Sequence, residues 1–244
     1  MRRRAGRGGG GFTLIELMIV IAIIATLAAI AIPGLLSSIR AANERSASAS
    51  LKTLASAEAD FKSNDRDDNK VQDYWTYDVS GLYSLTSAGI AGNNDPPIKL
   101  IDIAIAGADA SPGGVGIAGG HLAPISRFTN TTVKAGYWYC HLTGYWQPLS
   151  ANSWVGTTYR TNTGGVTMGS VHHHSAFGFL AYPDRYKSSG NQIFLINEDN
   201  VVLKRVLTAS IKPTSAIPPG IPTDLTIRYY PLEQWIRLYY SKMD

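Results

Sequence analysis

The sequence contains one cysteine, Cys140, among its 244 residues. It therefore cannot form an intrachain disulfide, a CxxC redox motif or a zinc site of four cysteines, and we expect this side chain to be a small, partly buried apolar group. Common catalytic motifs are also missing: there is no G-x-S-x-G, no H-E-x-x-H and no glycine-rich loop that ends in Lys-Ser or Lys-Thr. We therefore expect a protein that is not an enzyme and that requires no cofactor.

The chain has no excess charge beyond its first eleven residues. Its 22 Lys and Arg residues exceed its 18 Asp and Glu residues by four, and four arginines lie in the leader: Arg2, Arg3, Arg4 and Arg7. The rest of the chain therefore carries 18 basic and 18 acidic side chains. A nucleic-acid-binding protein needs a basic face on its folded body, so direct nucleic-acid binding is not predicted.

A long apolar run follows this basic leader. Leu17–Ile39 is a stretch of 23 residues without a charged side chain. As an α-helix it would measure about 34 Å, which is enough to cross a hydrocarbon core of about 30 Å. We therefore predict a membrane-spanning helix. The arginines precede it, so we expect the leader side to be cytoplasmic and the rest of the chain to lie outside the cytoplasm.

The small residues stand before the apolar run, at 8–11, whereas a secretory signal places its cleavage site after the run. The stretch Gly11–Val20, GFTLIELMIV, resembles the N-terminal segment of type IV pilins and type II secretion pseudopilins. This resemblance covers about residues 8–61. It implies that a prepilin peptidase cuts between Gly11 and Phe12 and methylates the new amine of Phe12. The apolar helix would then stay on the mature protein.

Glu16 is an acidic residue at the edge of this uncharged run. An ionised carboxylate there costs a few kcal/mol unless it has a partner. From the residues alone two interpretations remain open: the side chain reaches the lipid headgroups, or it has a functional role. The resemblance implies the second, in which Glu16 pairs with the N-terminal amine of a neighbouring subunit during assembly.

Pro33 interrupts the predicted helix. Proline cannot donate a hydrogen bond to the carbonyl of Ala29, so we expect a kink or a loosened turn there. Ser37 and Ser38, or neighbouring helices, are expected to compensate. The resemblance further implies that the helix stretches near Pro33 when subunits leave the membrane and assemble.

The pattern becomes amphipathic after the apolar run. Large or small apolar residues recur at helical spacing, namely Ile39, Ala47, Leu51, Leu54 and Phe61. We therefore predict one helix from about Phe12 to about Phe61. Four parts follow: a leader at 1–11, a transmembrane and assembly helix at 12–39, its amphipathic continuation at 40–62 and a globular domain at 63–244.

The globular part shows short strand patterns rather than long helices. We expect a hairpin around 198–200 and long surface loops at 107–120 and 161–169. A proline-rich connector should lead to a C-terminal helix that begins at Pro231. Together these elements predict an α+β, pilin-like fold, with the long helix packed on a small antiparallel sheet. The expected strands are Tyr137–Leu142, Trp154–Tyr159, Ala176–Tyr182, Gln192–Asn197 and Val201–Leu207.

Two groups of residues suggest metal binding. The spacing of Asp65, Asp67, Asn69 and Asp73 places oxygen ligands on alternate residues, as Ca²⁺ loops require. Lys70 stands where such loops usually have glycine, so the alternative is a solvated charge cluster that ends the helix. The second group is 172–174, three consecutive histidines, which we expect to lie in an exposed loop rather than to join His121 or His141 in a metal site.

The sequence thus predicts a structural subunit of a type IV pilus-like filament or of a type II secretion pseudopilus. The resemblance implies a helical homo-oligomer, with prepilin peptidase, an inner-membrane platform and, indirectly, an assembly ATPase as partners. It implies storage as a single-pass protein in the lipid of a bacterial inner membrane, and later a place in a periplasmic or surface filament. Two alternatives remain open: a minor pilin or tip adhesin that binds a receptor, and a membrane-anchored extracytoplasmic enzyme.

Overall fold

The structure is a computed structural model that describes residues 11–67, 70–85, 98–110, 131–142, 144–150, 153–161 and 170–206. The chain divides into two compact units, Met1–Ile39 and Arg40–Asp244. The expected proline-rich connector and C-terminal helix lie outside the described residues. The same holds for residues 111–120 and 162–169 of the two expected surface loops.

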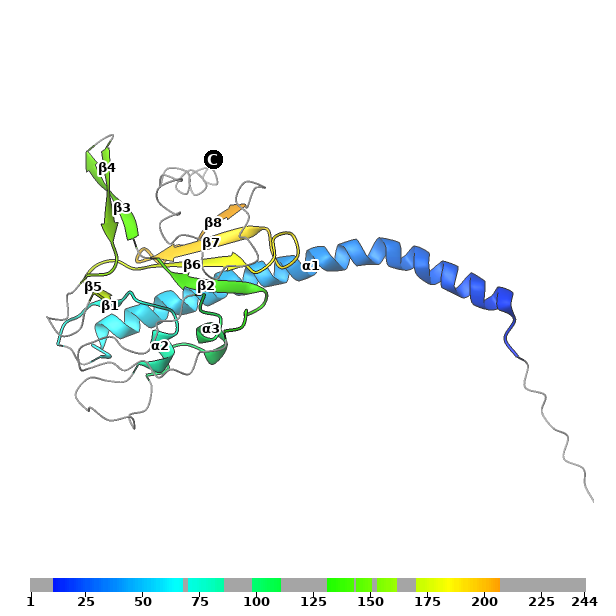
Figure 1. Ribbon diagram of the computed structural model, residues 1–244, viewed down its shortest axis with the longest axis horizontal. Helices are drawn as coiled ribbons and strands as arrows, with labels where there is room; N and C mark the ends of the chain where they lie inside the picture. Colours follow the sequence, from blue (N-terminus) through cyan, green and yellow to red (C-terminus); the bar gives the residue numbers. More distant parts are fainter. Residues whose placement is uncertain are drawn as a thin grey trace, which may run out of the picture. The chain divides into compact units, whose positions relative to one another are not determined.

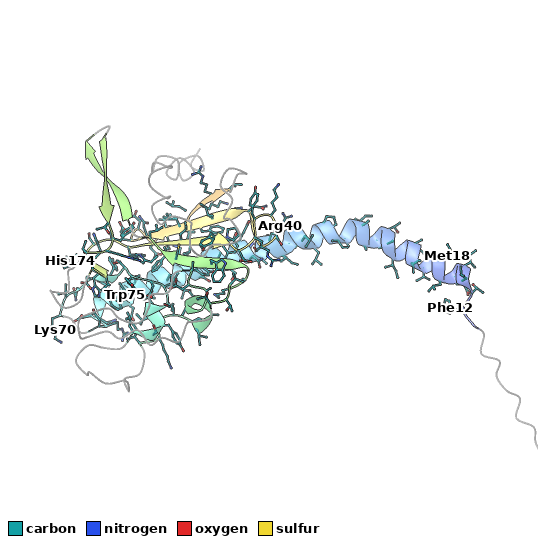
Figure 2. The ribbon with its side chains drawn as sticks, viewed as in Figure 1. Phe12, Met18, Arg40, Lys70, Trp75 and His174 are labelled. Atoms are coloured by element: carbon teal, nitrogen blue, oxygen red, sulfur yellow. The ribbon has the colours of Figure 1, made fainter. Side chains whose placement is uncertain are left out.

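Helix α1 runs from Leu14 to Ser63 and confirms the predicted long helix (Figure 1). In its first part no residue between 12 and 39 is buried. Phe12 is 81% exposed and Ile30 is 80% exposed, and the side chains around Phe12 and Met18 in Figure 2 point away from the helix in all directions. By length and composition this helix can cross a membrane.

The helix continues through Pro33. The hydroxyl groups of Ser37 and Ser38 both donate to the carbonyl oxygen of Gly34, at 2.8 and 3.0 Å. They therefore do not replace the hydrogen bond that the carbonyl of Ala29 lacks because Pro33 has no N–H. This part of the expectation is wrong. A hydroxyl on a helix reaches the carbonyl three or four residues earlier, and Ala29 is further away than that.

The second part of α1 has the predicted apolar stripe on its buried face. The stripe begins at Ala47, and the expectation that Ile39 belongs to it is wrong, because Ile39 is 46% exposed and lies in the first unit. Residues at steps of three and four are covered by the globular unit. They are Ala47, Ser50, Leu51, Leu54, Ala55, Ala57, Glu58 and Phe61.

Four antiparallel strands form the main sheet, in the order β2, β6, β7 and β8. They span Tyr137–His141, Gly178–Pro183, Gln192–Asn197 and Leu203–Val206. These strands and the β7–β8 hairpin confirm the sequence prediction. The hairpin turn contains Asn200 at φ 56°, a left-handed conformation that asparagine tolerates.

The two faces of this sheet are separated by strand alternation. Tyr139 on β2, Phe179 and Ala181 on β6, and Phe194 on β7 belong to one core that also contains the stripe of α1. The residues between them form a second, smaller core on the other face: Cys140, Leu180 and Tyr182, with Trp138, Ile193 and Leu195 packed against them. The described part of the chain is thus an α+β domain in which the helix covers one face of the sheet.

Smaller elements complete the globular unit. The β3–β4 hairpin, Gly144–Ser150 with Ser153–Thr158, confirms the strand expected near Trp154 and adds one that was not expected. β3 contains Pro148, and a proline within a run weakens the sequence pattern of a strand. Four short elements were also not predicted: β1 (Tyr74–Trp75), α2 (Gly81–Ser84), α3 (Ile103–Ala106) and β5 (His172–His173).

Hydrogen bonds hold the second part of α1 to the loops around the sheet. Asn43 Nδ2 donates to the carbonyl of Ser189 at 3.0 Å, and the Glu44 carboxylate accepts from the backbone N–H of Asn191 at 2.9 Å. Near the other end Lys62 Nζ donates to the carbonyl of His174 at 2.6 Å. These polar contacts fix which face of the helix meets the sheet.

Cys140 and His141 are both buried in the strand β2. Burial raises the pKa of the Cys140 thiol to about 12, so this cysteine is an inert apolar group, as expected. Burial also lowers the pKa of His141 to about 3, although its Nδ1–H donates to the carbonyl of Leu142 at 2.6 Å. His141 packs edge-on against Phe179 at 4.9 Å between ring centroids and is neutral at physiological pH.

Leu54→Ala should destabilise the globular unit by about 2–5 kcal/mol, because it opens a cavity beneath the sheet where Leu54 is fully buried. Urea unfolding of the full chain in a mild detergent, followed by tryptophan fluorescence, measures the loss. The neighbouring exposed residue Thr53 provides the control, and Thr53→Ala should change stability by less than about 0.5 kcal/mol. Equal effects of the two substitutions would contradict this packing.

His141→Gln should make the protein less sensitive to acid. The unfolded chain protonates this histidine near pH 6.5, whereas the folded chain does so only near pH 3, so wild-type stability falls as the pH drops through this window. Between pH 7 and pH 5 the wild type should lose about 2 kcal/mol more unfolding free energy than the variant. Parallel urea titrations at the two pH values test this, and identical losses would show that His141 is protonated in the folded state.

Candidate functional site

The predicted cleavage and assembly residues lie at the start of α1. Gly11 and Phe12 precede the helix and are exposed. Oε2 of Glu16 accepts hydrogen bonds from the backbone N–H of Thr13 at 2.8 Å and from its hydroxyl at 2.7 Å. The N–H of Glu16 in turn donates to the Thr13 hydroxyl oxygen at 3.3 Å. This reciprocal arrangement is a capping box, which satisfies two donors that the helix itself leaves unpaired.

The capping box changes the interpretation of Glu16. The sequence suggested a carboxylate whose partner had to come from lipid headgroups or another subunit. Within a single chain, however, Thr13 already holds one oxygen of Glu16, two residues after the predicted cleavage point. A carboxylate has about four lone-pair positions, so Glu16 can keep these bonds and still accept an ammonium group.

The other end of α1 closes into a tight loop. Asp60 forms an ion pair with Arg66 at 2.8 Å across the last helical turn. The chain then turns through two left-handed residues, Asp65 at φ 45° and Lys70 at φ 67°. The carboxylate of Asp65 accepts the N–H of Lys70 at 3.0 Å. Lys70 therefore adopts the conformation for which calcium loops usually use glycine, at a cost of about 1–2 kcal/mol.

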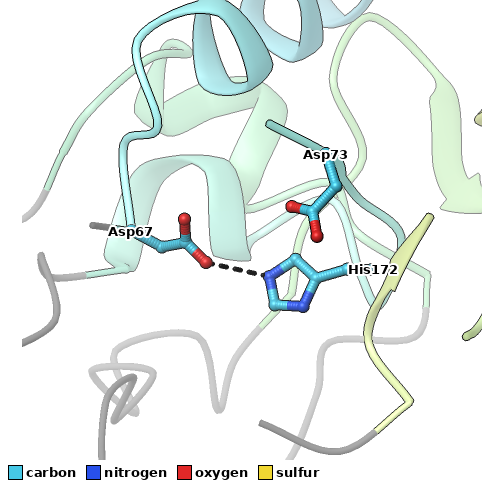
Figure 3. Close-up of side chains that lie close together, drawn as sticks. All are labelled: Asp67, Asp73 and His172. Atoms are coloured by element: carbon cyan, nitrogen blue, oxygen red, sulfur yellow. Dashed lines mark ion pairs between the residues drawn. The ribbon is translucent and has the colours of Figure 1, made fainter. Parts of the chain in front are cut away.

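Two aspartates, one between Asp65 and Lys70 and the other after Lys70, meet a histidine from a distant strand. Asp67, Asp73 and His172 each offer a ligand atom within 4.8 Å of those of the other two, and all three side chains are buried (Figure 3). His172 Nε2 lies 3.0 Å from Oδ2 of Asp67. Neither ring nitrogen of His172 makes an aligned hydrogen bond with a described residue. We refer to these three residues as the Asp-His cluster.

Packing sets the orientation of the His172 ring. The ring stacks on Phe61 at a centroid distance of 6.3 Å and meets the edge of Trp75 at 5.5 Å. Backbone pairing adds to this, because β1 and β5 place Trp75 opposite His172. Asp73 directly precedes β1, so this strand pair also carries the second carboxylate to the cluster.

The structure therefore gathers half of the predicted calcium ligands and adds one residue that was not expected there. Asp67 and Asp73 come together, Asp65 lies outside the cluster and Asn69 is not among the described residues. The expectation that the three histidines form an exposed loop is wrong for His172, which is buried in a strand, while His174 is exposed.

The other candidate histidines play no part in this cluster. His141 lies in the core against Phe179, and His121 falls outside the described residues. His173 is half-buried, and its Nδ1 accepts the backbone N–H of Ser175 at 3.2 Å and that of Ala176 at 2.9 Å.

Glu58 is a buried acid that the sequence analysis overlooked. One of its oxygens accepts the N–H of Trp75 at 3.0 Å, and the other has no hydrogen-bond partner in the described part of the chain. Burial raises the pKa of Glu58 well above its usual range, against the hydrogen bond from Trp75, and the charge of Asp73 raises it further. Its spacing from Leu54 and Phe61 by four and three residues was the available signal, since it places Glu58 on the apolar stripe.

Comparison with known protein families gives one match. Residues 7–32 match the family model described as the prokaryotic N-terminal methylation motif. No curated protein and no solved structure matches the chain. The motif is structural rather than enzymatic, and together with the apolar helix that it overlaps, it fits a protein anchored in an inner membrane. Residues 7–32 of this chain are therefore the prepilin-type cleavage and methylation segment of type IV pilins and pseudopilins.

Proposed function

We propose that the protein is a structural subunit of a type IV pilus-like filament or of a type II secretion pseudopilus. The observation that carries this proposal is the methylation motif at 7–32, which includes the start of α1, together with the apolar residues between 12 and 39, none of which is buried within the described part of the chain. Prepilin peptidase cuts between Gly11 and Phe12 and methylates the new amine. The mature chain is stored in the inner membrane and polymerises through α1.

The uncovered helix supports this function on physical grounds. Each Å² of apolar surface that stays in water costs about 25 cal/mol of free energy. Side chains such as Leu14, Leu27 and Ile30 carry this cost, because they are 63–80% exposed in the single chain. Lipid covers this surface before assembly. Copies of the same helix cover it afterwards. Because neighbouring helices simply replace lipid against this surface, a membrane protein can become a filament subunit without refolding its globular unit.

Glu16 guides this assembly by pairing with the Phe12 amine of a neighbouring subunit. Inside an apolar bundle of helices an isolated carboxylate and an isolated ammonium group are both costly, and pairing removes both costs. The Thr13 bonds hold the carboxylate in place at the start of the helix, so less side-chain freedom is lost when the pair forms. The platform and its ATPase extract the subunit from the membrane, with the globular unit on the extracytoplasmic side.

Intact-mass analysis of the protein from its native host should give a chain that begins at Phe12 and carries one added methyl group. The leader Met1–Gly11 should be absent from the mature form. Gly11→Leu should block cleavage and leave the full-length chain in the membrane, because a bulky residue replaces the exposed glycine at the cut. A mature protein that retains Met1 would refute the processing step and, with it, the proposed class.

Two substitutions at Glu16 separate the charge pair from the capping box. Glu16→Gln removes the charge but keeps an oxygen that accepts from Thr13, so helix capping survives. Glu16→Ala removes both. If the charge pair drives assembly, both variants should lose at least about 90% of the sheared filament recovered from cells, which corresponds to about 1.4 kcal/mol or more.

The control is Thr13→Ala, which weakens the cap but keeps the charge and should retain most of the filament yield. Mass analysis must show that every variant is cut and methylated at Phe12. Normal polymerisation of Glu16→Gln together with failure of Glu16→Ala would assign Glu16 to capping alone.

A further inference from the structure

The Asp-His cluster has the composition of a transition-metal site. Carboxylates alone suit Ca²⁺ and Mg²⁺, whereas an imidazole among them favours borderline ions such as Zn²⁺. In this cluster the imidazole of His172 comes from β5, and the carboxylates of Asp67 and Asp73 come from the segment between α1 and β1. The ligands thus belong to two segments that are about one hundred residues apart, which only a folded chain brings together.

The charges of the cluster call for a cation. Two aspartates and a histidine counted as neutral have a formal charge of −2. Moving each such charge out of water costs several kcal/mol unless the charges are compensated. A divalent ion brings the sum to zero.

One pair of ligand atoms in the cluster lies at about the spacing found around a bound ion. Tetrahedral Zn²⁺, with bonds of about 2.0–2.1 Å, separates its ligand atoms by about 3.3 Å. The 3.0 Å between His172 Nε2 and Asp67 Oδ2 is close to this value. These two atoms are close but are not aligned as a hydrogen bond, so their approach is better suited to a shared ion than to a shared proton.

We propose that Asp67, Asp73 and His172 bind one divalent transition-metal ion, with zinc as the best match, at a structural site in the globular unit. The ion ties the end of α1 to the β1–β5 strand pair. It stabilises the left-handed conformations of Asp65 and Lys70, two non-glycine residues beside the site. The site differs from the calcium loop suggested by sequence, since it uses His172 and leaves Asp65 outside. It does not depend on the filament function.

Metal content of the full chain provides the first test. The protein is purified in a mild detergent without a histidine tag, stripped with EDTA and dialysed against Zn²⁺ or against Ca²⁺. We expect about one Zn²⁺ per chain by mass spectrometry of the metal, and a rise of about 5–10 °C in the melting temperature when zinc exceeds its Kd a hundredfold. Cobalt in place of zinc should give a visible d–d spectrum, which needs no variant and is independent of stability.

Matched variants then locate the ligands. His172→Gln, Asp67→Asn and Asp73→Asn should each weaken zinc binding by more than about 10- to 100-fold. His174→Gln is the control for histidine, since His174 is exposed two residues away, and Asp65→Asn is the control for the loop carboxylates. Both controls should keep one zinc. Tryptophan fluorescence of the metal-free variants verifies that Trp75 remains buried.

Three results would overturn the proposal. The first is the absence of stoichiometric zinc, and of a cobalt spectrum, in the wild type. The second is undiminished zinc binding by a folded His172→Gln. The third is binding of calcium alone that Asp65→Asn abolishes and His172→Gln does not, which would establish the loop site instead. Failure of the filament experiments leaves all of these measurements unaffected.

Discussion

The structure depends on an apolar helix surface that a single chain does not cover. Between residues 12 and 39 no side chain of the helix segment is buried within the described part of the chain. An apolar surface of this kind is costly in water. The cleavage and methylation motif at 7–32 overlaps this segment, and Glu16 is the acidic residue within it.

The same helix then becomes the centre of a domain core. After Arg40 the helix belongs to the second unit, and its residue pattern changes from uniformly apolar to an apolar stripe that packs in the core. Leu51, Leu54 and Phe61 pack on the face of the sheet that carries Phe179 and Phe194, while polar bonds at both ends of this part fix the rotation of the helix. One element thus has a first part that is long and apolar enough to cross a membrane and a second part that is a core helix.

The acidic residues at the two ends of α1 differ in their exposure to solvent. At the first end Glu16 is exposed and held by Thr13, so its charge is available to another molecule. At the second end Asp67 and Asp73 are buried beside His172, and Glu58 is buried nearby under the influence of Asp73. Water solvates an exposed carboxylate, which therefore does not require a partner in its own chain. A buried carboxylate needs hydrogen bonds or an opposite charge within the folded unit.

The sequence alone determined the long helix, its division into an uncharged and an amphipathic part, the strands β2, β6, β7 and β8 and the methylation motif, because these depend on local patterns of charge and hydrophobicity. Only the tertiary structure decided that Asp67 and Asp73 meet His172 and that Asp65 does not. This juxtaposition arises from the pairing of β1 with β5, two strands of two residues each, and such short strands leave no periodic signal. The burial of Glu58 was decided in the same way, since a single acid on an apolar stripe is buried only when the sheet closes over it.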